Sequence, residues 1–165
     1  MRQHAPHHSE QLKPAGRNRR RGTTVVEMAV ILPVFFSFLF ALFEFSHAYM
    51  VISAISTASK KAARYGVAEG VSTAQVAART REILEDAFNI DSVTVMVKDA
   101  SAFDTPGTDP SSIDYQGLSN IELTNAEPRQ LFLIRVEVPY DDVAIIPPFW
   151  IKGATLSGQS VMRHE

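Results

Sequence analysis

The sequence has 165 residues, 45% of them hydrophobic and 21% charged, so it fits one modest domain and excludes a large multidomain enzyme. Its charge is unevenly distributed: residues 1–22 carry a formal charge of +5 and the remaining residues carry −7. The absence of cysteine excludes a disulfide scaffold, a thiol nucleophile and a cysteine-based metal site.

Residues 1–22 are basic and poor in apolar side chains, with one leucine and two prolines. Such a segment cannot bury enough apolar surface to offset the entropy of ordering, so we expect a disordered leader. Its last arginines, Arg19–Arg21, directly precede an apolar segment. Basic residues in that position hold one end of a membrane helix in the cytoplasm. We therefore prefer a topology signal to a nucleic-acid-binding tail, and we expect the C-terminal domain to be extracytoplasmic.

The next segment, Thr23–Ser46, is long enough to cross a membrane, because a spanning helix needs roughly 20 mostly apolar residues. Within it, Met28–Phe43 is a block of 16 residues without a charge. A buried core helix is the alternative, but the flanking arginines and the many phenylalanines favour a membrane span. Pro33 removes one backbone hydrogen bond and should kink this helix.

Beyond Ser46 the apolar residues keep a helical spacing, so the helix should continue out of the membrane and end between Gly66 and Gly70. Ser72 or Thr73 should cap a second helix that runs to about Phe88. The expected inner face of this second helix consists of Val76, Ile83, Leu84 and Ala87.

Three segments have the β-branched or alternating pattern of strands, namely Val93–Lys98, Leu131–Tyr140 and Ala154–Met162. The sequence therefore predicts an α+β protein, with a long N-terminal transmembrane helix that continues into an external domain. That domain should contain the second helix and a small antiparallel sheet. The predicted organisation is a cytoplasmic leader at 1–22, a transmembrane helix at 23–46 and an extracytoplasmic domain at 47–165.

Two connections are rich in turn residues. The segment from Asp99 to about Arg129 should be an exposed excursion, because it contains several Pro, Gly, Asp and Asn turn residues. The second connection contains Pro147–Pro148 followed by Phe149–Ile151. We expect it to be a rigid loop whose aromatic side chains pack on the sheet or the helix.

The segment from Arg19 to Glu27 combines a basic run, a glycine and an apolar helix with one acid five residues after the glycine. A peptidase at the cytoplasmic membrane face needs an extended, unhindered peptide, and Gly22 favours one because it has no side chain and resists helix formation. Cleavage after Gly22 would make Thr23 the new N-terminus. Glu27 would be costly within the membrane unless it were paired or near the interface. Its natural partner is the freed amine of a neighbouring subunit.

This N-terminal segment resembles the bacterial type IV pilin-like signal, and within it the TadE-like family of minor pilins or pseudopilins of tight-adherence (Flp) pili. The resemblance covers roughly residues 19–65 and depends on Arg20–Ala29, Ile31–Pro33 and Glu44–Phe45. It implies a single-pass inner-membrane precursor, trimmed by a prepilin peptidase, that acts in assembly of an adhesive pilus. The implied partners are that peptidase, other pilins, the assembly platform and membrane lipid.

Several alternatives remain open at this point. Gly22 can be a simple junction between leader and helix, and Glu27 can be an interfacial residue that reaches the lipid headgroups. Glu44 lies 17 residues beyond Glu27, about 25 Å along a helix, so we expect it at the opposite interface, where an acid needs no partner. A third hypothesis is secretion, with conventional cleavage after Ala48 in Ser46–Ala48.

Enzymatic function is disfavoured, and no cofactor is expected. Four of the five histidines are His4, His7, His8 and His47, which leaves only His164 beyond the long N-terminal helix and argues against a hydrolytic triad or a zinc site in the outer domain. Asp104, Asp109 and Asp114 could contribute to calcium binding, but they lack the dense oxygen pattern of an EF-hand. A solvated acidic loop is the preferred interpretation.

Overall fold

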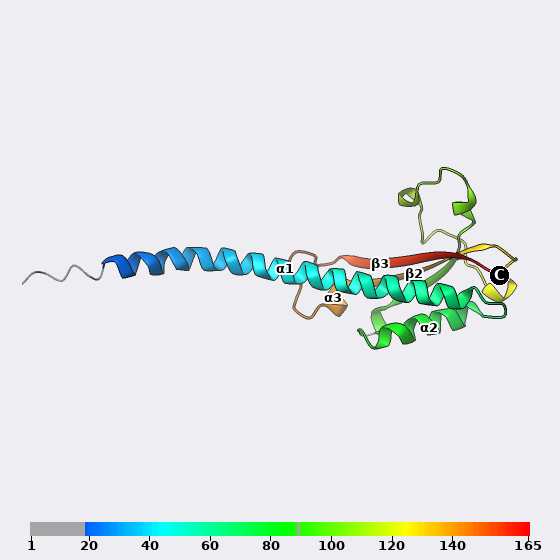
Figure 1. Ribbon diagram of the computed structural model, residues 1–165, viewed down its shortest axis with the longest axis horizontal. Coiled ribbons are helices and arrows are strands. Elements are labelled where there is room, and N and C mark those ends of the chain that lie inside the picture. Colours follow the sequence, from blue (N-terminus) through cyan, green and yellow to red (C-terminus); the bar gives the residue numbers. More distant parts are fainter. Residues whose placement is uncertain (1–18, 89) are drawn as a thin grey trace, which may run out of the picture. The chain divides into compact units, whose positions relative to one another are not determined.

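The computed structural model of the protein describes residues 19–88 and 90–165, and the predicted disordered leader lies outside them up to residue 18. The chain forms helices α1 (Arg19–Gly66), α2 (Thr73–Glu85) and α3 (Tyr140–Val143) and strands β1 (Thr94–Asp99), β2 (Leu131–Pro139) and β3 (Thr155–Arg163) (Figure 1). Short 3-10 helices occupy Ile90–Ser92, Ser101–Asp104, Pro110–Ser112 and Leu123–Asn125. The predicted α+β architecture is confirmed.

The chain divides into two compact units, residues 1–40 and residues 41–165, and α1 begins in the first. In the first unit the helix already includes Arg19–Gly22, four residues before the expected start at Thr23. The basic run therefore continues the helix, as arginine's good helix propensity allows. Pro33 lies inside α1, and its ring nitrogen cannot donate the usual bond to the carbonyl of Ala29.

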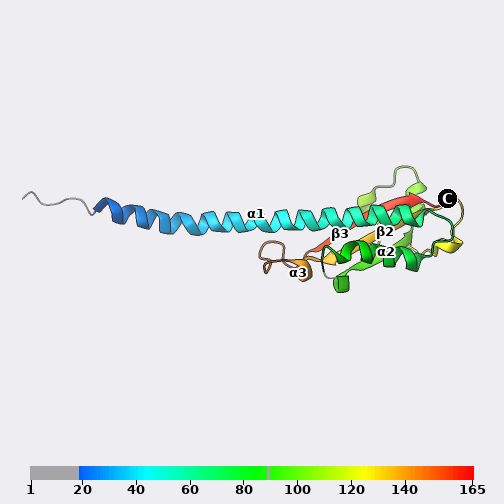
Figure 2. The same cartoon turned by 60° about the horizontal axis from the view of Figure 1, so that its bottom comes forward.

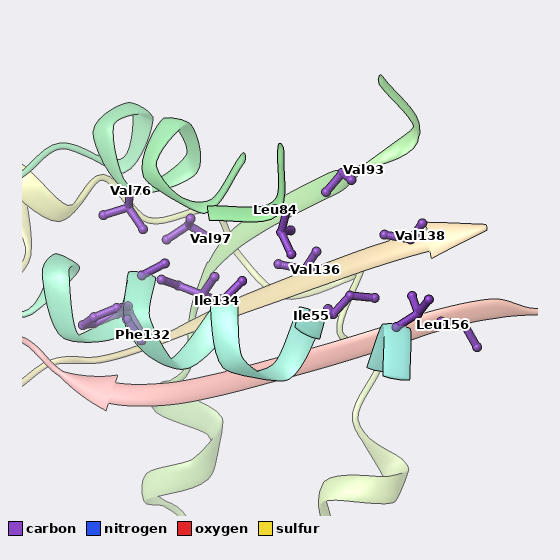
Figure 3. Close-up of a cluster of buried hydrophobic side chains, with 14 of the residues drawn as sticks. Ile55, Val76, Leu84, Val93, Val97, Phe132, Ile134, Val136, Val138 and Leu156 are labelled. Atoms are coloured by element: carbon purple, nitrogen blue, oxygen red, sulfur yellow. The ribbon is translucent and has the colours of Figure 1, made fainter. Parts of the chain in front are cut away.

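In the second unit the sheet is antiparallel with the order β1-β2-β3. The central strand β2 is more buried than either edge strand. Its side chains alternate between the two faces of the sheet. The helix-facing set, fully buried, is Phe132, Ile134, Val136 and Val138. Figure 3 shows these side chains converging with Ile55 of α1, Val76 and Leu84 of α2, and Val97 of β1.

The part of α1 in the second unit carries the other side of this core. Its buried side chains recur every three or four residues, which places them on one face of the helix. They are Glu44, His47, Ala48, Val51, Ile55, Ala58, Ser59, Ala62 and Ala63. The helix ends at Gly66 as expected, where an added Cβ would lie only 3.1 Å from Val76 Cγ2 and 3.2 Å from Leu123 Cδ1.

Helix α2 starts where the sequence predicts, because Ser72 and Gln75 form a reciprocal capping box. It ends at Glu85 rather than near Phe88, and Ala87 is exposed instead of facing the core. Thr80 is buried in its place, and its hydroxyl donates to the Val76 carbonyl at 2.8 Å. That local bond allows a polar side chain to occupy the inner face.

The excursion between β1 and β2 covers the sheet face that is turned away from the helices (Figures 1 and 2). Ala100, Leu131 and Leu133 form a second small apolar cluster with Phe103, Tyr115 and Leu118 of this segment. The excursion is therefore only partly the exposed loop that was expected. The excursion also contacts α2, because the Glu122 carboxylate accepts a hydrogen bond from Thr73 N at 2.9 Å. This hydrogen bond lowers the pKa of Glu122 below its ordinary value.

Strand β2 ends at Pro139, one residue earlier than expected, and Tyr140 begins α3. The segment from α3 to β3 is closed at its base by two contacts. Tyr140 N donates to Ala154 O at 2.8 Å, and Gly153 N donates to the Asp141 carboxylate at 3.0 Å. This closed segment lies at the end of the sheet opposite the C-terminus (Figure 2).

Candidate functional site

The predicted processing site lies in the first turns of α1. Gly22 is helical in this structure, so the expected extended peptide around the Gly22–Thr23 bond is not observed. Two features make this turn easy to open. Glycine in a helix costs about 1 kcal/mol relative to alanine, and the first four amides of a helix have no intrahelical acceptor. Cleavage at this bond stays a prediction.

The helix that follows has an apolar surface that no described part of the chain covers. Glu27 is exposed within it, and residues 24–88 and 90–165 provide no partner for its carboxylate. The surrounding side chains are between 39% and 70% exposed. They are Val25, Val26, Met28, Val30, Ile31, Leu32, Val34, Phe35, Phe36, Phe38, Leu39 and Phe40. A patch of this extent marks a membrane or partner surface, and the helix is long and apolar enough to cross a membrane.

Glu44 corrects the expectation that an acid at this position needs no partner. Its side chain is only 8% exposed, and its carboxylate accepts hydrogen bonds from three successive backbone amides. Ile151 N donates to Oε1 at 2.8 Å, Trp150 N donates at 3.1 Å, and Phe149 N donates to both oxygens at 3.2 Å. Hydrogen bonds to an ionised acceptor are the strong class. We call this arrangement the Glu44 clamp, because it fixes the loop before β3 to α1.

A second polar contact lies beside the Glu44 clamp. The Tyr140 hydroxyl donates to the backbone carbonyl of Glu44 at 3.2 Å and lies 3.2 Å from His47 Nδ1. Burial raises the pKa of the Tyr140 phenol, and the Glu44 carboxylate raises it further. The phenol therefore stays protonated at neutral pH and remains a donor, so α3 is held on the same turn of α1 as the loop.

Sequence reasoning missed this cluster, although a signal for it was present. Glu44 and His47 begin the three- and four-residue spacing that continues through Ala48, Val51 and Ile55. The inner face of the domain therefore starts inside the segment assigned to the membrane. The partners on the loop could not be found from periodicity, because they are backbone amides.

The aromatic residues of that loop also differ from expectation. Phe149 and Trp150 pack edge-to-face on each other, with ring centroids 4.9 Å apart, instead of packing into the core. Phe149 is 78% exposed and Trp150 is 40% exposed. Ile151, the next residue, is the one that contacts the core.

The three aspartates singled out in the excursion each have a partner in the fold. Asp104 pairs with Arg163 at 2.6 Å, Asp109 caps a 3-10 helix through Ser111 N, and Asp114 accepts from Gln116 N. No group of three His, Asp or Glu side chains is placed to hold a metal ion in the part of the chain that the structure describes. Asp109 and Asp114 stabilise turns, and Asp104 links the excursion to β3.

Arg135 is a polar residue on the sheet face that the excursion covers, and it makes several contacts. Its guanidinium donates to Glu137, Gln159 and Ser157, and it stacks 4.6 Å from the ring centroid of Tyr115. These contacts engage three guanidinium nitrogens and one ring face, so the group fixes the excursion on the sheet rather than presenting a free cation.

A groove of about 530 Å³ lies between α1 and α2. Its walls are mostly apolar, with Ser53, Thr57 and Lys61 as the polar members.

Comparison with known proteins finds a family similar to the N-terminal segment. The model of the family described as TadE-like protein matches residues 22–64. No curated protein and no solved structure matches this chain. The match begins at the predicted cleavage glycine and ends two residues before the end of α1. Together with the apolar helix, it points to a membrane protein associated with a tight-adherence pilus. Residues 22–64 of this chain are thus similar to the TadE-like family, which matches the resemblance found in the sequence.

Proposed function

We propose that this protein is a single-pass minor pilin or pseudopilin that takes part in assembly of a tight-adherence pilus. The observation that carries the proposal is the uncovered apolar surface of α1 within the TadE-like segment. Apolar side chains of this number need lipid or other apolar helices around them. The proposed location is the bacterial inner membrane, with the N-terminus cytoplasmic and the folded domain outside, because the basic charge precedes the span.

The proposed partners follow from the two ends of the apolar segment. A prepilin peptidase would cut between Gly22 and Thr23, in the helical turn that is easiest to open. Glu27 would then pair with the new N-terminal amine of a neighbouring subunit, since an unpaired carboxylate at membrane depth is costly. Other pilins and the assembly platform would pack laterally on the helix, and lipid would surround the remainder.

The N-terminal residue of the mature protein tests this proposal most directly. Thr23 is the expected first residue in a strain that assembles the pilus. The variant Gly22→Phe should accumulate as the untrimmed precursor, because a bulky side chain obstructs the scissile bond. Gly22→Ala is the matched control, since it adds only a methyl group and should still be trimmed. Mature protein beginning at Thr23 in the Gly22→Phe strain would contradict the proposed processing.

The alternative is an anchored or secreted binding domain unrelated to pili. Secretion with cleavage after Ala48 is disfavoured by one structural observation. Such cleavage would remove Glu44 and His47, whose side chains are buried against the domain and bonded to its loop and α3. Tyr49 as the mature N-terminus would support secretion, and an intact Met1 would support an uncleaved anchor.

A further inference from the structure

The loop between α3 and β3 presents a second apolar surface outside the core. From Val143, the last residue of α3, to Ile151 the chain has nine residues without a charge. Four of its side chains project into solvent: Ile145 is 70% exposed, Ile146 46%, Phe149 78% and Trp150 40%. Isolated exposed apolar residues need no explanation, but four within six positions on one loop form a contiguous patch.

In residues 147–151 of this loop the backbone N–H groups are also satisfied or missing, which suits an apolar environment. Pro147 and Pro148 have no amide hydrogen, and the amides of Phe149, Trp150 and Ile151 all donate to Glu44. Five consecutive residues therefore present no free N–H donor. Each free donor adds to the cost of moving a peptide segment into an apolar environment, so the Glu44 clamp lowers that cost while it fixes the loop.

The position of the loop along α1 is set by the same contact. Glu44 is the first charged residue after the uncharged block that ends at Phe43. At about 1.5 Å per residue, the 20 residues from Thr24 to Phe43 span about 30 Å, the thickness of the hydrocarbon layer. Glu44 therefore falls where such a helix leaves the hydrocarbon, and the loop is held at that level. Tryptophan and other aromatic side chains are enriched at this depth.

We propose that the loop formed by residues 143–151 is a membrane-interface anchor, in which Ile145, Ile146, Phe149 and Trp150 insert into the headgroup region of the lipid leaflet around α1. The inference rests on the proposed membrane span. It adds a second attachment point, which fixes the domain against the membrane and restricts rotation of the domain about the helix axis. Asp142 and Lys152 flank the uncharged segment and mark its aqueous boundary.

The single tryptophan of the chain is Trp150, so its fluorescence reports on this loop alone. The full chain is reconstituted into vesicles of phosphatidylethanolamine and phosphatidylglycerol that contain brominated lipids as quenchers. Lipid brominated near the carbonyl end of the acyl chains should quench Trp150 more strongly than lipid brominated near the methyl end. Protection from aqueous iodide should accompany the lipid quenching.

The control moves the probe to the far end of the domain. Tyr65 is an exposed aromatic residue 21 positions beyond Glu44 on α1, about 30 Å further along the helix. In the double variant Trp150→Phe with Tyr65→Trp, the probe should be quenched by iodide and not by brominated lipid. Lipid quenching at both positions would mean that the domain lies flat on the bilayer, and would overturn a loop-specific anchor.

Two further variants test separately the apolar side chains and the Glu44 clamp. Replacing Ile145, Ile146 and Phe149 by Ser keeps Trp150 and the Glu44 clamp, and should remove most of the lipid quenching. Glu44→Ala keeps every apolar side chain but frees three amides, so it should also reduce the quenching; circular dichroism verifies that both variants fold. Unchanged lipid quenching in the triple-Ser variant would overturn the proposal.

Vesicle flotation distinguishes failure of this inference from failure of the membrane span. Protein that does not float with the vesicles contradicts the span itself. Protein that floats while Trp150 remains open to iodide contradicts only the loop anchor. A blue-shifted emission that depends on protein concentration and not on brominated lipid would assign the patch to a second copy of the chain, and would equally overturn the lipid proposal.

Discussion

Gly158 of β3 lies directly against α1, and this close approach leads to a specific prediction. A Cβ added at this position would lie 2.8 Å from the backbone nitrogen of Ser56 and 2.9 Å from Ile55 Cγ2. The Ser59 hydroxyl donates to the Gly158 carbonyl at 3.2 Å, so the helix is held against the strand at this point. The variant Gly158→Ala should therefore force the two elements apart.

The size of the effect follows from these distances. Ordinary van der Waals contact begins at 3.4 Å, so the new methyl group requires a shift of about 0.6 Å. One of the atoms in the way belongs to the α1 backbone and cannot rotate aside. Adding a methylene to a well-packed core costs about 1–3 kcal/mol, and we expect the upper half of that range here. For a domain of this size, that loss lowers Tm by roughly 10 °C.

The assay is thermal unfolding of the detergent-solubilised full chain, followed by near-ultraviolet circular dichroism. This signal reports on tertiary packing around the aromatic residues, whereas the helix signal persists in a micelle. Gly117→Ala is the matched control: its Cβ would lie 2.7 Å from Asp114 Oδ2, but that atom is the far end of an exposed side chain, which can rotate aside and lose only its local hydrogen bond from Gln116 N. The reasoning is refuted if Gly158→Ala unfolds at the same temperature as Gly117→Ala.

Three other outcomes are expected. Glu27→Gln should leave trimming and membrane insertion intact, because only the charge attraction is lost. It should reduce the number of cross-links to partner pilins and the amount of surface pilus. Unchanged cross-linking and piliation would make Glu27 a simple interfacial residue. A reporter fused after Glu165 that is active only in the cytoplasm should be silent, and a signal from a stable fusion would reverse the proposed orientation. Burial raises the pKa of Asp99, but hydrogen bonds from Ser101 and Gln130 outweigh it and hold that pKa below the ordinary 3.8. The contribution of Asp99 to the free energy of unfolding is therefore complete above pH 3.8 and is lost as the pH falls through the lower folded pKa. The denaturation midpoint of Asp99→Asn should then fall less between about pH 6 and pH 3 than that of the wild type. An identical fall in both proteins would exclude this role.

Local pattern and composition were sufficient for much of this protein. The long uncharged block predicted an apolar helix, the capping residue Ser72 predicted the start of α2, and β-branched alternation predicted all three strands to within one residue. These features depend on the residues of one segment, so they can be recognised without knowing what the segment packs against. The TadE-like resemblance belongs to the same class, because its motif lies within one continuous helix.

Other features were decided by the tertiary structure. The sequence predicts that Glu44 is an acid at a membrane boundary. In the fold its side chain is buried, and its carboxylate accepts hydrogen bonds from three backbone amides more than a hundred residues away. Backbone amides carry no sequence signal, so no pattern could identify these partners. The sequence also does not show that a glycine is required at position 158, because that requirement depends on how closely β3 packs against α1. Long-range contacts of this kind determine which side chains of the Phe149–Trp150 loop remain outside the core, and hence which apolar surface the domain exposes.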